Sequence, residues 1–218
     1  MSVTECWLDL NFVVDSSGSI VFNDSRNWNK SLQFVADVVD QLAVGPNDAQ
    51  VAFVLFSHIA TVEWGLTRYR DKESIINAIL SVSFLGKNTN LNDALYLTRT
   101  RVFAPGEGTR PGAVKATVIL TDGVDNVPSR RTPLTLQNAT LCKDDGIRLI
   151  AIGVTDGVDE DRLREIASSQ SDYYKVKNFD DLTNVIDGLK SHICTAAPAS
   201  SKTFHFTLFT CNQGAGLA

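Results

Sequence analysis

Short apolar runs alternate with longer amphipathic segments along most of this chain. Residues 50–57 are apolar on both faces, which is typical of a central strand. Residues 59–66 alternate apolar and polar side chains and predict an edge strand, paired antiparallel through a tight turn. Residues 25–44 place large apolar side chains at helical spacing. By the same criteria, further strands are predicted at residues 6–15, 116–121, 148–154 and 173–176, and further helices at residues 71–82, 92–102, 134–144, 159–168 and 180–193.

Strands separated by crossover helices predict an α/β fold. We expect a doubly wound, mainly parallel six-stranded sheet with one antiparallel edge strand and helices on both faces. Residues 1–194 are predicted to form this single domain, followed by a small-residue linker and a short tail of open role at residues 195–218. In open sheets of this kind, ligands bind at the carboxyl ends of strands near the topological switch point.

Composition and charge limit the classes of partner. The formal net charge is −5 and the pI about 5.2, and no block of Lys or Arg is present to neutralise phosphates, which argues against a nucleic-acid partner. No apolar run approaches the roughly 18–20 residues of a transmembrane helix. The first residues lack the basic start and apolar core of a signal peptide, which is compatible with an intracellular protein or with a fragment of a secreted one.

The most informative residues follow the ends of two predicted strands. Asp15, Ser17 and Ser19 alternate after the first strand and offer one carboxylate and two hydroxyls, while Asp122 follows the strand at residues 116–121. Thr89 lies between them in sequence and offers a third hydroxyl. Magnesium takes near-octahedral oxygen ligands. The set predicts a divalent metal site, with Mg²⁺ or Mn²⁺ favoured over Ca²⁺.

This D-x-S-x-S … T … T-D-G set resembles the metal-ion-dependent adhesion site of von Willebrand factor type A domains. The resemblance implies that Ser17, Ser19 and Thr89 bind the metal directly, and that Asp15 and Asp122 bind it directly or through water. It also implies an open metal position that an Asp or Glu of a protein partner can complete. Chelators are therefore expected to abolish both metal and partner binding.

The resemblance spans residues 6–194 and extends beyond the metal set. Residues 110–115 and 173–182 look like matrilins and the A domains of collagens, while residues 89–95 are similar to apicomplexan surface adhesins. Asn88 is inserted before the threonine relative to the usual family spacing. The extra short helix of collagen-binding integrin domains has no room here, which makes direct collagen binding less favoured without excluding it.

The cysteines indicate in which cellular compartment the protein resides. Cys6 and Cys194 bracket the domain, and their positions together with the family resemblance imply a disulfide between them, which needs an oxidising compartment. Such a bridge would tether the last helix and predicts weak allosteric switching. Cys142 lies on the apolar side of a predicted helix and is expected to be an inert buried thiol. Cys211, in the tail, has no assigned role.

Two further sets of surface residues are candidates for recognition or modification. N-x-S/T sequons support secretion only weakly, and the candidate glycosylation sites are Asn23, Asn29 and Asn138. Arg130 and Arg131 follow the Asp122 loop. They are either a rim that favours acidic partners or a solvated pair.

An enzyme is not expected. A haloacid dehalogenase-type phosphatase needs a second Asp where Ser17 stands, no G-x-S-x-G elbow occurs, and His58, His192 and His205 are scattered. The favoured function is a secreted, extracellular matrix module that binds a protein partner, such as collagen, through a divalent metal. The alternatives are an intracellular adaptor in a multiprotein assembly and a structural spacer in a matrix protein.

Overall fold

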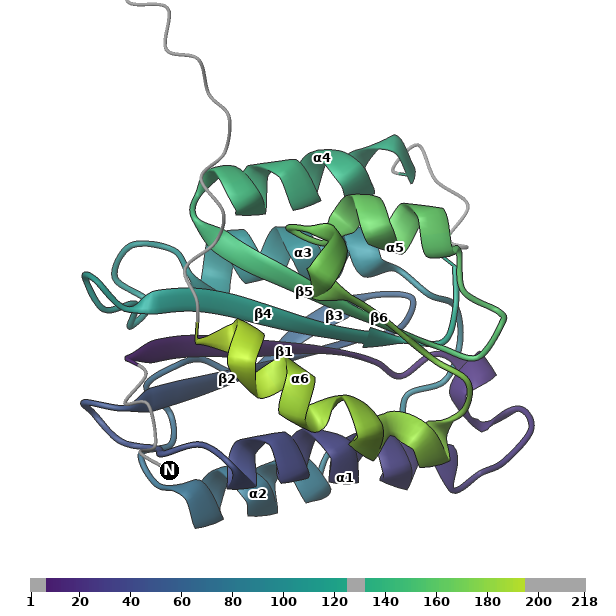
Figure 1. Ribbon diagram of the computed structural model, residues 1–218, viewed down its shortest axis with the longest axis horizontal. Coiled ribbons are helices and arrows are strands. Elements are labelled where there is room, and N and C mark those ends of the chain that lie inside the picture. Colours follow the sequence, from purple (N-terminus) through teal and green to yellow (C-terminus); the bar gives the residue numbers. More distant parts are fainter. Residues whose placement is uncertain (1–6, 125–131, 195–218) are drawn as a thin grey trace, which may run out of the picture.

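The computed structural model describes residues 7–124 and 132–194, which form an α/β fold around one sheet (Figure 1). The six strands of the described part run in the order β3-β2-β1-β4-β5-β6. Only β3 is antiparallel to its neighbour, so the predicted mainly parallel sheet with one antiparallel edge is confirmed. The strands are β1 Leu8–Asp15, β2 Ala49–Phe56, β3 Ala60–Trp64, β4 Val114–Thr121, β5 Ile147–Val154 and β6 Tyr173–Val176.

Helices cover both faces of the sheet, as the doubly wound prediction requires. One face carries α1 (Asn27–Asp40), α2 (Lys72–Leu80) and α6 (Ile186–Ile193), and the other carries α3 (Leu91–Leu97), α4 (Thr132–Asp144) and α5 (Glu160–Ile166), as Figure 1 shows. Two buried apolar clusters correspond to these faces.

The alternation of strand side chains explains the two clusters. In β1, Leu10, Phe12 and Val14 belong to the cluster that contains the apolar residues of α1, whereas Val13 belongs to the opposite cluster. Successive residues of a strand face opposite sides, and a sheet covered on both faces therefore buries all of them. None of the described helices is long and apolar enough to span a bilayer.

Two predicted helices are divided in the structure. The helix expected at residues 92–102 changes at Thr98 to a π-helical turn, Thr98–Val102. There the Thr98 hydroxyl donates to the carbonyl of Ala94 at 2.8 Å and accepts from the Asn11 amide at 3.1 Å, and such back-bonding bends helices. The helix expected at residues 180–193 begins as a 3₁₀ helix (η4, Phe179–Val185) before α6.

The strand order reverses between β1 and β4, which are adjacent parallel strands. The loops that follow these two strands both lie at the right-hand edge of the sheet in Figure 1. This is the topological switch point, where open parallel sheets bind their ligands. Residues 195–218, predicted as linker and tail, lie outside the described residues.

Candidate metal centre

The first part of the candidate site is the turn after β1. Asp15 ends this strand opposite Phe56 of β2 and is 1% exposed. Its carboxylate accepts a hydrogen bond from the backbone N–H of Ser17 at 2.8 Å and another from the hydroxyl of Thr121 at 2.5 Å. A short 3₁₀ helix, Gly18–Val21, follows. The carboxylate is therefore held in one orientation between the ends of two neighbouring strands.

Three side-chain oxygens form a continuous array beside this turn. The Oγ of Ser17 lies 3.0 Å from the Oγ of Ser19, which donates a hydrogen bond to Asp122 Oδ1 at 2.6 Å. In an octahedral shell with metal–oxygen distances of about 2.1 Å, neighbouring ligand oxygens lie about 3.0 Å apart. The array has spacings close to those that an ion of the size of Mg²⁺ requires.

Thr89 joins the array through its position beside Gly123. A β-carbon at Gly123 would lie 3.3 Å from the Oγ1 of Thr89 and 3.5 Å from the Oγ of Ser19. Both hydroxyls thus approach the same backbone position, next to Asp122. Any side chain at Gly123 would crowd them, which gives a physical reason for glycine there. The structure brings together all five residues of the predicted metal set.

Backbone hydrogen bonds connect the Thr89 loop to the β1 turn. Gly18 N–H donates to the carbonyl of Lys87 at 2.8 Å, and Gly86 N–H donates to the carbonyl of Ser16 at 2.9 Å. Gly86 and Lys87 both have a φ of 73°, in the left-handed region. The two left-handed residues form a compact turn, so the extra residue Asn88 does not carry Thr89 away from the site.

The two carboxylates are held in surroundings that suit a cation. Burial raises the pKa of Asp15 to about 7; hydrogen bonds from Thr121 and Ser17 oppose this shift, and the charge of Asp122 adds to it. Burial also raises the pKa of Asp122, and its hydrogen bond with Ser19 opposes the shift. Within the described ranges, no Lys or Arg forms a salt bridge with either carboxylate. A divalent cation would supply the missing positive charge.

The donor set of the site is mostly hydroxyl. Among the described residues, no group of three or more His, Cys, Asp or Glu is placed to hold a metal ion. Hydroxyl and carboxylate oxygens suit hard cations rather than the nitrogen- and sulfur-ligated zinc of structural sites. The residues present therefore fit a divalent cation that accepts oxygen ligands.

Several other predicted residues lie outside the array. Cys6, Arg130 and Arg131 are outside the described residues, so neither the Cys6–Cys194 bridge nor the basic rim is tested. Cys194 directly follows α6. Cys142 is fully buried, and burial raises the pKa of its thiol to about 12, in agreement with the prediction of an inert thiol.

The three sequons differ in structure. Asn23 and Asn29 are exposed near the start of α1. Asn138, on α4, is partly buried, and its Nδ2 donates to the Oδ1 of Asn92 at 2.9 Å. A glycan is attached through this nitrogen, so the structure favours Asn23 and Asn29 over Asn138.

Two residues of the site were given no role by the sequence reasoning. Thr121 holds the carboxylate of Asp15, and the buried Ser16 accepts a hydrogen bond from the Leu85 N–H at 2.8 Å. Both stand inside the quoted motifs, but their bonds connect residues far apart in sequence. Pairing of Asp15 with Thr121 follows only once β1 and β4 are known to be neighbours.

Comparison with known proteins identifies the family. Residues 9–188 match the model of the von Willebrand factor type A domain, and the chain belongs to this family. It is 31% identical over 199 residues to the collagen alpha-1(XII) chain of Notophthalmus viridescens, covering 88% of this chain and 20% of that protein. It is 32% identical over 188 residues to matrilin-1 of Homo sapiens, covering 85% of this chain and 36% of that protein. The chain spans well under half of either relative.

Solved structures agree with this assignment. Proximal thread matrix protein 1 from the mussel byssus, with a zinc-occupied MIDAS motif, has a TM-score of 0.80 at 30% identity, over 88% of this chain and 47% of that chain. The manganese-loaded TRAP protein of Plasmodium vivax has a TM-score of 0.71 at 20% identity, over 88% of this chain and 75% of that chain, and shows the same fold. The family match and the matrix relatives confirm the prediction of a matrix-type A domain, which belongs to a non-enzymatic family.

Proposed function

We propose that this domain is a secreted matrix-binding module that holds Mg²⁺ or Mn²⁺ and binds an acidic side chain of a protein partner through it. The observation that carries the proposal is the oxygen array of Ser17, Ser19 and Asp122, joined by Thr89 beside Gly123. Similarity to matrilin-1, to collagen XII and to a byssal matrix protein supports an extracellular setting.

Each residue has a separate part in this proposal. Ser17, Ser19 and Thr89 provide hydroxyl ligands, and Asp122 orients Ser19 and supplies charge. Asp15 holds the β1 turn in shape through Ser17 and adds the second negative charge. When bound, the ion supplies a Lewis-acidic position for an incoming carboxylate. Because most of the direct donors are neutral hydroxyls, the ion stays more Lewis-acidic than it would be with carboxylate ligands.

Thr89 is the ligand to test first, because the family spacing is disturbed before it. Replacing Thr89 with valine keeps the shape of the side chain and removes the hydroxyl. We expect the affinity for Mn²⁺ in a calorimetric titration to fall by at least about tenfold. Thr140→Val, on the exposed side of α4, is the matched control and should bind Mn²⁺ like the wild type.

The same variants test partner binding. Purified matrix proteins, collagens included, are immobilised and probed with and without EDTA. The proposal predicts capture that needs the metal and weakens in Thr89→Val. Metal binding without any metal-dependent capture would favour the spacer role. Unchanged Mn²⁺ affinity in Thr89→Val would remove this residue from the site.

The proposed extracellular setting includes a disulfide between Cys6 and Cys194. A count of reactive thiols in unfolded, non-reduced protein should then give no more than two of the four cysteines. Four reactive thiols would contradict the bridge and favour an intracellular adaptor. The count should be made on protein produced in a secretory host, since the bridge forms only under oxidising conditions.

A further inference from the structure

Large apolar side chains are exposed unevenly over the described surface. Seven such residues are exposed in the described part of the chain. Four of them lie on loops at the carboxyl edge of the sheet, where the metal centre is. We name these four residues the apolar rim, and their exposed fractions are Phe22 86%, Ile59 50%, Leu85 44% and Val124 39%. Exposed apolar groups that gather in one place mark interaction sites.

Each member of the rim is connected to the site by a short path. The N–H of Phe22 donates to the carbonyl of Ser19 at 3.1 Å. The N–H of Leu85 donates to the hydroxyl of Ser16 at 2.8 Å. Val124 directly follows Gly123. The rim residues therefore lie beside the oxygen array.

Ile59 belongs to the turn between β2 and β3, at the same edge. The side chain of Asn90, which follows Thr89, donates from its Nδ2 to the carbonyl of His58 at 3.1 Å. This bond joins the β2–β3 turn to the loop that carries Thr89. Ile59 therefore occupies the side of the site that lies away from β4.

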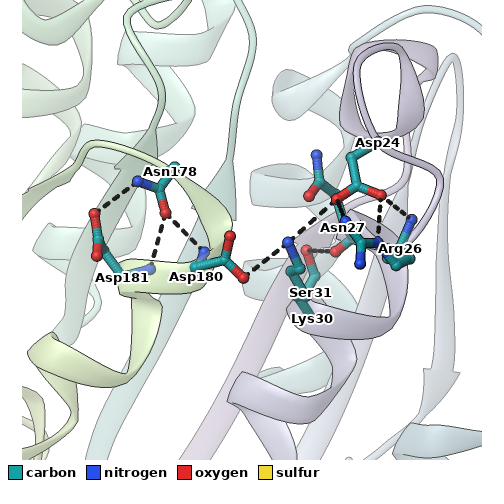
Figure 2. A network of polar contacts seen from close by, with 8 residues as sticks. All are labelled: Asp24, Arg26, Asn27, Lys30, Ser31, Asn178, Asp180 and Asp181. Carbon is teal, nitrogen blue, oxygen red and sulfur yellow. Dashed lines mark hydrogen bonds and ion pairs between the residues drawn. The ribbon is translucent and has the colours of Figure 1, made fainter.

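The loop that carries Phe22 is held in place although its ring is exposed. Two residues later, Asp24 accepts hydrogen bonds from Arg26 at 2.9–3.0 Å and from Lys30 at 3.3 Å. Lys30 also forms a salt bridge with Asp180 at 2.8 Å, as Figure 2 shows. The network joins the start of α1 to η4. An aromatic ring presented from a fixed loop loses little conformational freedom when it binds.

We propose that the apolar rim selects partners whose metal-binding carboxylate is flanked by large apolar side chains. The inference rests on the proposed function and adds the chemistry of the partner segment. Positive charge at the edge, from the bound cation and from the exposed Lys87, fits the carboxylate, and Phe22 and Leu85 fit its apolar neighbours. Contacts that surround a central interaction and exclude water from it strengthen protein interfaces.

Matched synthetic peptide pools provide the test. Each pool has one central Glu, flanked by Phe and Leu in the first pool and by Ser and Gln in the second, and a third pool has Gln in place of Glu between Phe and Leu. In Mn²⁺, the wild type should bind the first pool at least about tenfold more tightly than the second. The third pool should not bind in a metal-dependent way.

Four variants test which residues produce the preference for the apolar-flanked Glu pool. Phe22→Ser and Leu85→Ser should lose most of the preference for the apolar-flanked pool. Leu80→Ser is the matched control, because Leu80 ends α2, lies outside the rim loops and is 46% exposed, against 44% for Leu85. Lys87→Gln should weaken both Glu pools alike. Calorimetry should give the same Mn²⁺ affinity for Phe22→Ser, Leu85→Ser and Leu80→Ser as for the wild type.

The outcomes separate the two proposals. If the wild type binds both Glu pools equally, or if Phe22→Ser keeps the preference for the apolar-flanked pool, the rim proposal is wrong. Metal-dependent binding of a carboxylate would be unaffected by this result. If Mn²⁺ binds but neither Glu pool does, the carboxylate step of the proposed function is wrong, and the rim proposal falls with it. Tight binding of the third pool would show apolar binding independent of the metal and would also overturn the proposal.

Discussion

Replacing Asp15 with asparagine should stabilise the metal-free protein at pH 8 by about 2–4 kcal/mol while abolishing Mn²⁺ binding. The pKa of Asp15 rises from 3.8 to about 7 in the folded state, chiefly because the carboxyl group is buried. Between these values the folded state binds more protons than the unfolded state. The stability of the metal-free wild type therefore falls as pH rises from about 4 to 7 and is lowest above pH 7.

Asparagine removes this dependence and keeps the contacts of the turn. Its carbonyl can accept from the Ser17 N–H, and its amide can donate to the Thr121 hydroxyl, which now accepts. Urea denaturation in EDTA at pH 5, 6, 7 and 8 measures the effect. The wild type should lose stability across this range, whereas Asp15→Asn should change much less. Added Mn²⁺ should stabilise the wild type at pH 8 and do so less at pH 5, where protons compete.

Exposed Asp161 on α5 is the matched control for this experiment. Asp161→Asn should alter the free energy of unfolding by no more than about 0.5 kcal/mol and leave Mn²⁺ binding intact. If the metal-free wild type were equally stable at pH 5 and pH 8, or if Asp15→Asn were the less stable protein at pH 8, the electrostatic account of this site would be wrong.

Replacing Arg110 with methionine should destabilise the fold by about 3–5 kcal/mol, because it leaves a buried carboxylate without its positively charged partner. Asp9, fully buried in β1, accepts two hydrogen bonds from Arg110, both at 2.8 Å. One comes from the side-chain Nε and the other from the backbone N–H. The guanidinium also donates to the carbonyls of Leu8 at 2.7 Å and Asp48 at 2.9 Å. This clamp joins the starts of β1 and β2 to the loop before β4.

The clamp lies at the edge of the sheet opposite the metal centre, so stability and metal binding should separate. Urea denaturation with and without Mn²⁺ should show the loss in Arg110→Met, whereas its Mn²⁺ affinity in the folded state should match that of the wild type. The double variant Asp9→Asn/Arg110→Met should recover part of the stability, since no unpaired charge is then buried. A loss below about 1 kcal/mol would contradict the assigned role.

The sheet and the grouping of the five candidate metal residues were predictable because their signals are local. Residues 50–57 are apolar on both faces whatever their neighbours, and Asp15 and Asp122 each follow a strand. The division of the helix at residues 92–102 was not predictable, because it depends on the buried Asn11 of β1 contacting Thr98. Such a contact appears only once the helix is placed on the sheet.

Two further features depend on the same kind of long-range contact. Asn138 satisfies the sequon pattern, yet its nitrogen is used by Asn92 of another helix. The extra residue Asn88 changes the motif spacing. The left-handed conformation of Gly86 and Lys87 explains how the loop accommodates this residue and keeps Thr89 at the site. Neither a hydrogen bond between helices nor the sign of φ at a lysine can be inferred from residue types alone.

The placement of the two described ends has a mechanical consequence. Trp7 precedes β1 and Cys194 follows α6, and Figure 1 shows the start of β1 and the end of α6 at the edge opposite the metal loops. A pull applied through these ends is carried across that edge, where Arg110 clamps the first strand. The loops that hold Ser19 and Asp122 lie outside the line of load. Under the proposed function, these loops would keep their contacts with a partner while the rest of the molecule is under tension.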